Sequence, residues 1–160
     1  MNKKFLGILA ALVVLGSTSV FASAAIGAQG GYSVASGSGN GNAAITFKLS
    51  NVPAVFAADF SIANNTLYGA GITADWWMAN PKAGGMIHYF YGPGIAFSLF
   101  DFNNLGFFVG GRFVAGLNIF VVKPLELYLQ AAAQLGFSSY AGNAGFAWYF
   151  PINFGFRFWF

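Results

Sequence analysis

The stretch Pro151-Ile-Asn-Phe-Gly-Phe-Arg-Phe-Trp-Phe160 decides the fold of this chain. Large apolar residues stand at every second position from Ile152 to Phe160, and Asn153 and Arg157 stand between them. Successive side chains of a β-strand point to opposite faces, so a period of two predicts a strand with one aromatic face and one polar face.

Composition indicates which surroundings that aromatic face meets. Charged residues make up only 7% of the chain and aromatic residues 19%, whereas a soluble domain has about 25% charged residues. A soluble barrel of the lipocalin type needs a charged exterior, and this chain has too few charges to build one. We therefore expect the apolar faces of the strands to meet lipid and the polar faces to point into a barrel.

A membrane-spanning helix is the alternative for the segment 105–122. Arg112 lies near the middle of that segment, and an arginine at the centre of a membrane helix costs about 2.5–3.5 kcal/mol. Read as a strand, the same segment places its small and polar residues on one face and its large apolar residues on the other. The strand reading is therefore favoured: Gly110, Arg112, Gly116 and Asn118 share one face, and Phe107, Val109, Phe113, Leu117 and Ile119 share the other.

The same alternation recurs along the chain and predicts the fold class. We expect an all-β protein, a membrane-spanning eight-stranded antiparallel up-and-down β-barrel, because a closed single-chain barrel has an even number of strands. Its loops at the outer end are expected at 37–42, 64–66, 101–104 and 137–145. The expected strands cover 28–36, 43–50, 55–63, 67–79, 86–100, 105–120, 125–136 and, after the loop 137–145, a last strand that ends at Phe160.

Three local features give sharper expectations. Proline cannot donate to a strand ladder, so Gly92-Pro93-Gly94 predicts a bulge or kink. A turn over Val52-Pro-Ala-Val55 would place Lys48 directly opposite Asp59. Glu126 and Arg157 lie at the same end of neighbouring antiparallel strands with the same inward parity, which predicts an ion pair.

The amino-terminal residues predict export. Lys3 and Lys4 precede the apolar run 5–16, and Ala22-Ser-Ala24 provides a small-x-small cleavage site. The apolar run is shorter than the roughly 20 residues that a membrane helix needs. We therefore expect a signal peptide over residues 1–24, a barrel domain over residues 25–160 and localisation in the cell outer membrane. The chain contains no cysteine, which excludes disulfides and thiolate sites.

The chain resembles the small eight-stranded outer-membrane barrels, a group that includes the OmpA transmembrane domain and uncharacterised porin-like outer-membrane barrel domains. The resemblance implies the barrel architecture and is nearly silent on activity. It also implies that the aromatic residues of the last strand, Phe156, Phe158 and Phe160, form the signal that the barrel-insertion machinery reads. The matching segments are 89–94, Gly110-Gly-Arg112, Gly116-Leu117, 124–128, Gly155-Phe-Arg157 and Phe160.

The polar residues of inward parity are the candidates for function. An eight-stranded barrel has an interior just wide enough for side chains to fill, and confined charges must be paired. We therefore favour a structural network over an ion path, which gives a structural or weakly porin-like role. The candidate set is Lys48, Asp59, Asp75, His88, Arg112, Asn118, Glu126, Gln130, Gln134, Asn153 and Arg157.

Two other function classes remain open. A surface adhesin would act through the loop 137–145, with Tyr140 and Asn143 as contacts. A lipid-modifying barrel enzyme would need a histidine that activates a serine, and the chain's single histidine, His88, has no serine two residues on. We expect no enzyme activity, no cofactor and no metal site. The expected partners are outer-membrane lipid and the insertion machinery, with no nucleic acid, and the protein is expected to be a monomer.

Overall fold

The computed structural model describes residues 24–35, 38–63 and 66–160. The predicted signal peptide lies, except for Ala24, outside these residues. No helix in the described ranges is long and apolar enough to cross a membrane. The strands are β1 (Ala24–Ala35), β2 (Ser38–Leu49), β3 (Ala54–Ala63), β4 (Thr66–Trp76), β5 (Lys82–Gly84), β6 (Ile87–Phe100), β7 (Gly106–Val122), β8 (Leu125–Tyr140) and β9 (Asn143–Trp159).

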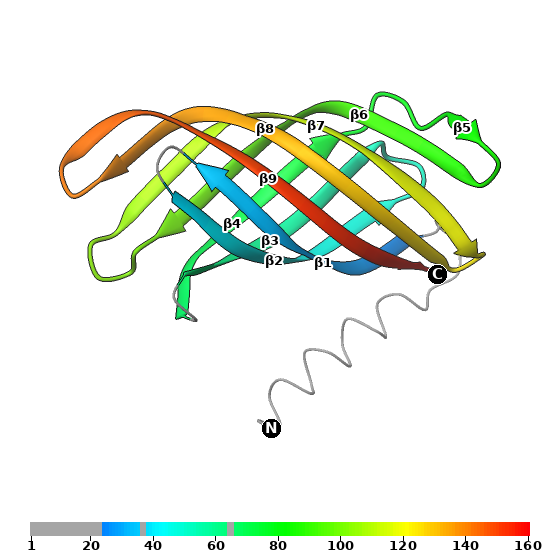
Figure 1. Cartoon of the computed structure of the whole chain (residues 1–160), viewed down its shortest axis with the longest axis horizontal. Helices are drawn as coiled ribbons and strands as arrows, with labels where there is room; N and C mark the ends of the chain where they lie inside the picture. The colour runs from blue at the N-terminus through cyan, green and yellow to red at the C-terminus, as the bar shows by residue number, and fades with distance from the viewer. Residues whose placement is uncertain (1–23, 36–37, 64–65) are drawn as a thin grey trace, which may run out of the picture.

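Eight of these strands form a closed antiparallel barrel in which each long strand pairs with its neighbours in sequence (Figure 1). The ladder runs from β4 through β1 to β9 and on to β6, and pairing between β4 and β6 closes it. The short strand β5 pairs only with β6 and extends one end of the sheet. The predicted class, a membrane-spanning eight-stranded up-and-down barrel, is confirmed.

The pairing register tilts the strands against the barrel axis. Tracing paired residues once round the barrel from Arg157 of β9 returns to β9 at Ala147. Such a stagger of the hydrogen-bond register is what gives barrel strands their tilt, and the oblique strands of Figure 1 display it. We call the end at which β1 begins and β9 finishes the inner end, and the opposite end the outer end.

Alternation sorts the side chains of every long strand. In β9, Asn153 and Arg157 are buried inside the barrel, whereas Phe154 and Phe156 are 57% and 41% exposed on its outside. Apolar side chains cover the outer surface of the other long strands in the same way. An exterior of this kind is stable only against hydrocarbon, so the outward residues are the lipid-facing ones.

The strands at the outer end are longer than expected. The segment 137–145, predicted as a loop, is instead a hairpin in which β8 and β9 pair up to Tyr140 and Asn143. Only Ala141 and Gly142 form its turn, with φ angles of 49° and 78°, the left-handed values that a two-residue hairpin turn requires. The tract 37–42 was likewise expected to be a loop, but β2 begins at Ser38 and Gly41 pairs with Tyr32.

Pro93 does not interrupt its own strand. The register of β6 against β7 is continuous, with Pro93 opposite Phe113. The expected irregularity lies in the neighbouring strand: β4 pairs up to Asp75 and Gly94, and contact with β6 resumes as an isolated bridge between Ala79 and Tyr91. The ladder is therefore broken on the side of Pro93 that faces β4.

The expected pairing of Lys48 with Asp59 is wrong. Lys48 stands opposite Val55, and Asp59 stands opposite Ala44. The turn between β2 and β3 is centred earlier in the chain than the one assumed from Pro53, and the partner of Lys48 differs by four residues, an even number. Such a shift leaves both side chains on the inward face, so the alternation that predicted the faces does not determine the register.

The close approach of β4 and β6 requires a glycine at position 94. A Cβ atom at Gly94 would lie 2.2 Å from Asp75 Oδ1 and 2.7 Å from the Ala74 carbonyl oxygen. We predict that Gly94→Ala destabilises the barrel by about 1–3 kcal/mol, the usual cost of overpacking, measured by urea unfolding of refolded protein. Gly111→Ala is the control, because a Cβ there meets no atom within 4 Å; equal midpoints for both variants would contradict the prediction.

Candidate functional site

The inner end of the lumen holds a buried ion pair. Arg157 Nη1 lies 3.3 Å from Glu126 Oε1, and neither side chain is exposed. Glu126 also accepts hydrogen bonds from Asn118 Nδ2 and Trp159 Nε1, each at 2.9 Å, and Arg157 Nε donates to Thr46 Oγ1 at 3.3 Å. The expected pair is therefore present, and three further residues hold its two charges.

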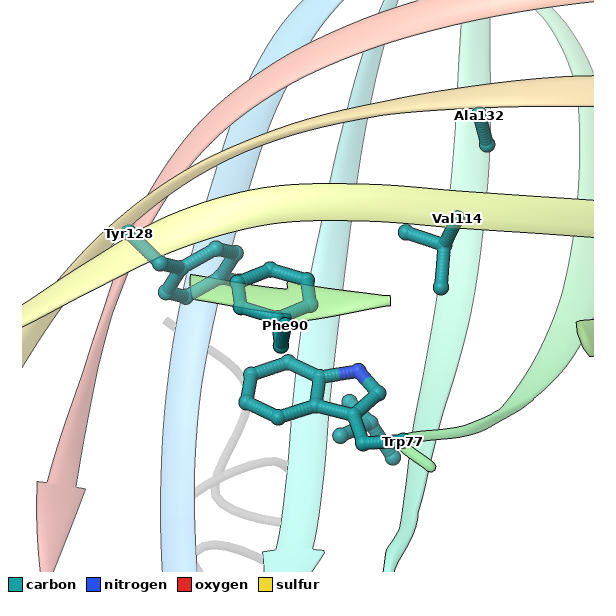
Figure 2. Close-up of a cluster of buried hydrophobic side chains, with 6 residues drawn as sticks. Trp77, Phe90, Val114, Tyr128 and Ala132 are labelled. Atoms are coloured by element: carbon teal, nitrogen blue, oxygen red, sulfur yellow. The ribbon is translucent and has the colours of Figure 1, made fainter. Parts of the chain in front are cut away.

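Aromatic rings close the lumen beside this pair. The rings of Trp77 and Phe90 stack with their centroids 3.6 Å apart, and Tyr128 lies next to Phe90 in Figure 2. Lys48 Nζ lies 3.6 Å from the centroid of the Trp77 ring, and Arg157 Cζ lies 3.9 Å from that of Tyr128. We call Trp77, Phe90 and Tyr128 the aromatic plug; all three are almost completely buried.

Polar side chains join the plug to the middle of the barrel. The Tyr128 hydroxyl donates to Gln29 Oε1 at 3.0 Å, and Gln130 Nε2 donates to the same oxygen at 3.2 Å. These bonds link β8 to β1 across β9. Val114 and Ala132 belong to the same buried cluster as the three rings and are 0% and 2% exposed.

A second ion pair lies on the outer side of the aromatic plug. Arg112 Nε and Asp75 Oδ1 are 2.9 Å apart, with both side chains almost fully buried. Neither atom has an aligned hydrogen bond among the described residues, so the contact is a charge contact. It joins β7 to β4 across β6, where Gly94 carries no side chain.

Beyond Arg112 the lumen widens into a cavity of about 240 Å³. We call it the outer cavity. Residues of all eight barrel strands line it, and most of them are polar or small. Those used below are Asn42, Asp59, Arg112, Asn153 and Ser98.

One contact ties together two turns at the outer rim. The Tyr140 hydroxyl donates to Asp101 Oδ2 at 2.5 Å, and this bond holds the pKa of the Asp101 carboxyl below its usual value. Asp101 also accepts from the backbone N–H groups of Asn103 and Asn104. The β8–β9 hairpin is thereby fastened to the β6–β7 turn.

The structure places the candidate residues at different levels of the lumen. Lys48, Asn118, Glu126 and Arg157 lie at the plug, Asp75 and Arg112 form the second ion pair, and Asp59 lines the outer cavity. His88 lies at the inner end, half-buried, with its ring edge against Phe120. Of the remaining candidates, Gln130 bonds to Gln29, whereas Gln134 and Asn153 line the outer cavity.

Sequence reasoning missed the aromatic part of the lumen. Trp77 shares the parity of Asp75, and Phe90 shares that of His88. Both therefore had an inward signal, but only polar residues were taken as lumen candidates. Gln29 was missed because the first strand is rich in glycine and alanine, so its faces are weakly marked. Thr46 had a clear signal, since it shares the inward parity of Lys48 in an alternating strand.

The titratable residues of the described ranges can be compared with the arrangements that bind metal ions. No group of three histidine, aspartate or glutamate side chains there is placed to hold a metal ion. The Nδ1 atom of His88 has no hydrogen-bond partner among these residues, and the ring's aromatic contact is Phe120.

No protein-family model matches the chain, and no curated protein sequence does. Crystal structures similar to it include the following two. Neisserial surface protein A (NspA) has a TM-score of 0.58 and 12% identity, over 85% of this chain and 95% of that one. The N-terminal β-barrel domain of Pseudomonas aeruginosa OprF has a TM-score of 0.51 and 15% identity, over 86% and 98%.

This chain has the fold of the small outer-membrane β-barrels. Both similar structures are eight-stranded outer-membrane barrels, and the resemblance expected from the sequence is confirmed at the level of the fold. The TM-scores of 0.58 and 0.51 support the shared architecture, whereas identities of 12% and 15% assign no activity.

Breaking the inner ion pair tests its contribution to stability. We predict that Arg157→Leu lowers the stability of the refolded barrel by about 3–5 kcal/mol, because Glu126 is left charged and unpaired in a buried site. The measurement is the urea unfolding midpoint in detergent or lipid. Lys123→Leu, which removes an exposed cation at the same end, is the control, and an Arg157 variant as stable as this control would contradict the prediction.

Proposed function

We propose that the protein is an integral outer-membrane barrel with a structural role and a lumen closed at its inner half. The observation that carries this proposal is the aromatic plug, in which the Trp77 and Phe90 rings lie 3.6 Å apart. Rings at this separation leave no room for water between them. The three plug residues are also at most 4% exposed, so we expect no continuous polar path from the outer cavity to the inner end.

The arrangement of charges supports a structural role. Two of the inward cations have a carboxylate partner within 3.3 Å, as Arg157 has Glu126 and Arg112 has Asp75. Lys48 lies over the ring of Trp77 instead, an arrangement worth about 2 kcal/mol or more where the cation is desolvated. Each of these cations is fixed by a neighbour, whereas a pore needs charges that face water.

Conductance distinguishes a closed barrel from a weak porin. We predict that the refolded protein gives no discrete conductance in planar lipid bilayers. The double variant Trp77→Ala/Phe90→Ala should give discrete openings, because it removes both stacked rings from the lumen. Trp76→Ala is the matched control, since Trp76 is the neighbouring tryptophan but is 52% exposed on the lipid side.

Two results would contradict the closed barrel. Discrete openings of the unaltered protein would favour the weakly porin-like role. Openings of equal size in the Trp76 and Trp77/Phe90 variants would mean that the plug does not control passage. Heat-modified migration in gels would establish that each variant is folded before its conductance is compared.

We further propose that residues 1–24 direct export and that the aromatic face of β9 is the element read by the insertion machinery. Phe156 and Phe158 point outward, with their rings 6.1 Å apart. Phe160 follows on the same face and is 72% exposed. The Trp159 N–H donates to the Pro124 carbonyl oxygen at 2.8 Å, which holds the end of β9 at the rim of the closed barrel.

Deletion of Phe160 separates recognition from packing. We predict strongly reduced outer-membrane levels in cells with near-normal refolding into detergent, since an exposed ring contributes at most about 1–3 kcal/mol to folding. Phe154→Ala is the control because Phe154 lies on the same face within β9. Normal cellular levels after the deletion, or equal losses in both assays, would refute a recognition role.

A further inference from the structure

We propose that the outer cavity binds a small organic cation with an ammonium group, held by the carboxylate of Asp59. The cavity opens away from the aromatic plug, so a ligand reaches it from the outer end. This inference does not depend on whether the barrel conducts.

Charge favours a cation. The charged residues that line the outer cavity are Asp59, which is negative, and Arg112, which is positive. Arg112 is bound to Asp75 at 2.9 Å, whereas Asp59 has no ion-pair partner within 4.0 Å among the described residues. Counted at their formal charges, Asp59, Asp75 and Arg112 sum to one negative charge, next to the open space.

Three polar side chains of the cavity wall have unused bonding capacity. Asp59 Oδ2, Asn153 Oδ1 and both polar atoms of Asn42 are buried and have no hydrogen-bond partner among the described residues. Asn153 is only 3% exposed. Buried polar groups without partners are costly, and an ammonium group that donates to several of these oxygens would satisfy them.

The register brings the three side chains to one side of the cavity. Gly31 of β1 pairs with Asn42 of β2 and also with Asn153 of β9. A Cβ atom at Gly31 would lie 2.4 Å from Asn153 Oδ1, so the amide lies over the glycine, on the side of Asn42. Asp59 comes from β3, the next strand after β2.

Size and ligand count favour an organic ammonium ion over a metal ion. Calcium takes six to eight oxygen ligands, often from several carboxylates, and the outer cavity offers one unpaired carboxylate. Its volume of about 240 Å³ is several times the roughly 30 Å³ share of one water molecule. An ammonium group at Asp59 would therefore leave space for further ligand atoms.

Ethanolamine is a suitable probe. Ethylene glycol serves as its neutral analogue, and calcium chloride tests whether a metal ion binds instead. The full chain without its predicted signal peptide is refolded in detergent, and the side-chain amide resonances of Asn42 and Asn153 are followed by NMR during each titration. Asp59→Asn removes the proposed anchor. Asp101→Asn removes an equal charge at the outer rim, outside the cavity, and is the matched control.

We expect saturable shifts of both amides with ethanolamine and none with ethylene glycol. Asp59→Asn should weaken ethanolamine binding about tenfold or more, as expected for loss of a charge-assisted hydrogen bond, and Asp101→Asn should leave it unchanged. Equal responses to both probes would mean that the cavity takes any small polar molecule. That result would overturn the proposal. So would shifts with calcium alone, no shifts at all, or undiminished binding of ethanolamine by Asp59→Asn.

Discussion

The rest of the structure depends on the absence of water around the outside of the barrel. In hydrocarbon every backbone N–H and C=O must be bonded within the protein, so the sheet has to close. β4 and β6 supply that closure, although Pro93 lacks a donor, because the ladder is already broken on that side. The same lack of water directs the polar side chains of the strands into the lumen.

Confinement then determines how the lumen is filled. Eight strands enclose a space that side chains can fill, and unpaired charges inside it would be costly. At the inner end Arg157 is satisfied by Glu126, Thr46 and the Tyr128 ring, and Lys48 lies on Trp77. At the outer end small side chains leave a cavity. The barrel is thus closed on one side and hollow on the other.

Alternation of residues predicts which side chains face lipid and which face the lumen. It predicted the Glu126–Arg157 pair because Glu126 lies at the start of β8 and Arg157 near the end of the antiparallel neighbour β9, so both lie at the same end with inward parity. The register of β2 and β3 escaped prediction, since an even shift preserves both faces. The inward position of Trp77 was not predicted, because an inward tryptophan has the same apolar character as an outward one. The β8–β9 hairpin escaped because serine, glycine and alanine between Phe137 and Gly145 read as loop residues, while pairing with a neighbouring strand overrides such weak propensities.

Solvent access along the lumen tests most directly the claim that the barrel is closed. The chain has no cysteine, so single cysteines report without background. Ser98 lines the outer cavity, whereas Val114 is fully buried beyond Arg112. The rate of labelling by a membrane-impermeant thiol reagent is the measurement, made on refolded Ser98→Cys and Val114→Cys in lipid vesicles. A closed lumen predicts rapid labelling at position 98 and almost none at position 114; comparable rates at both positions would contradict it.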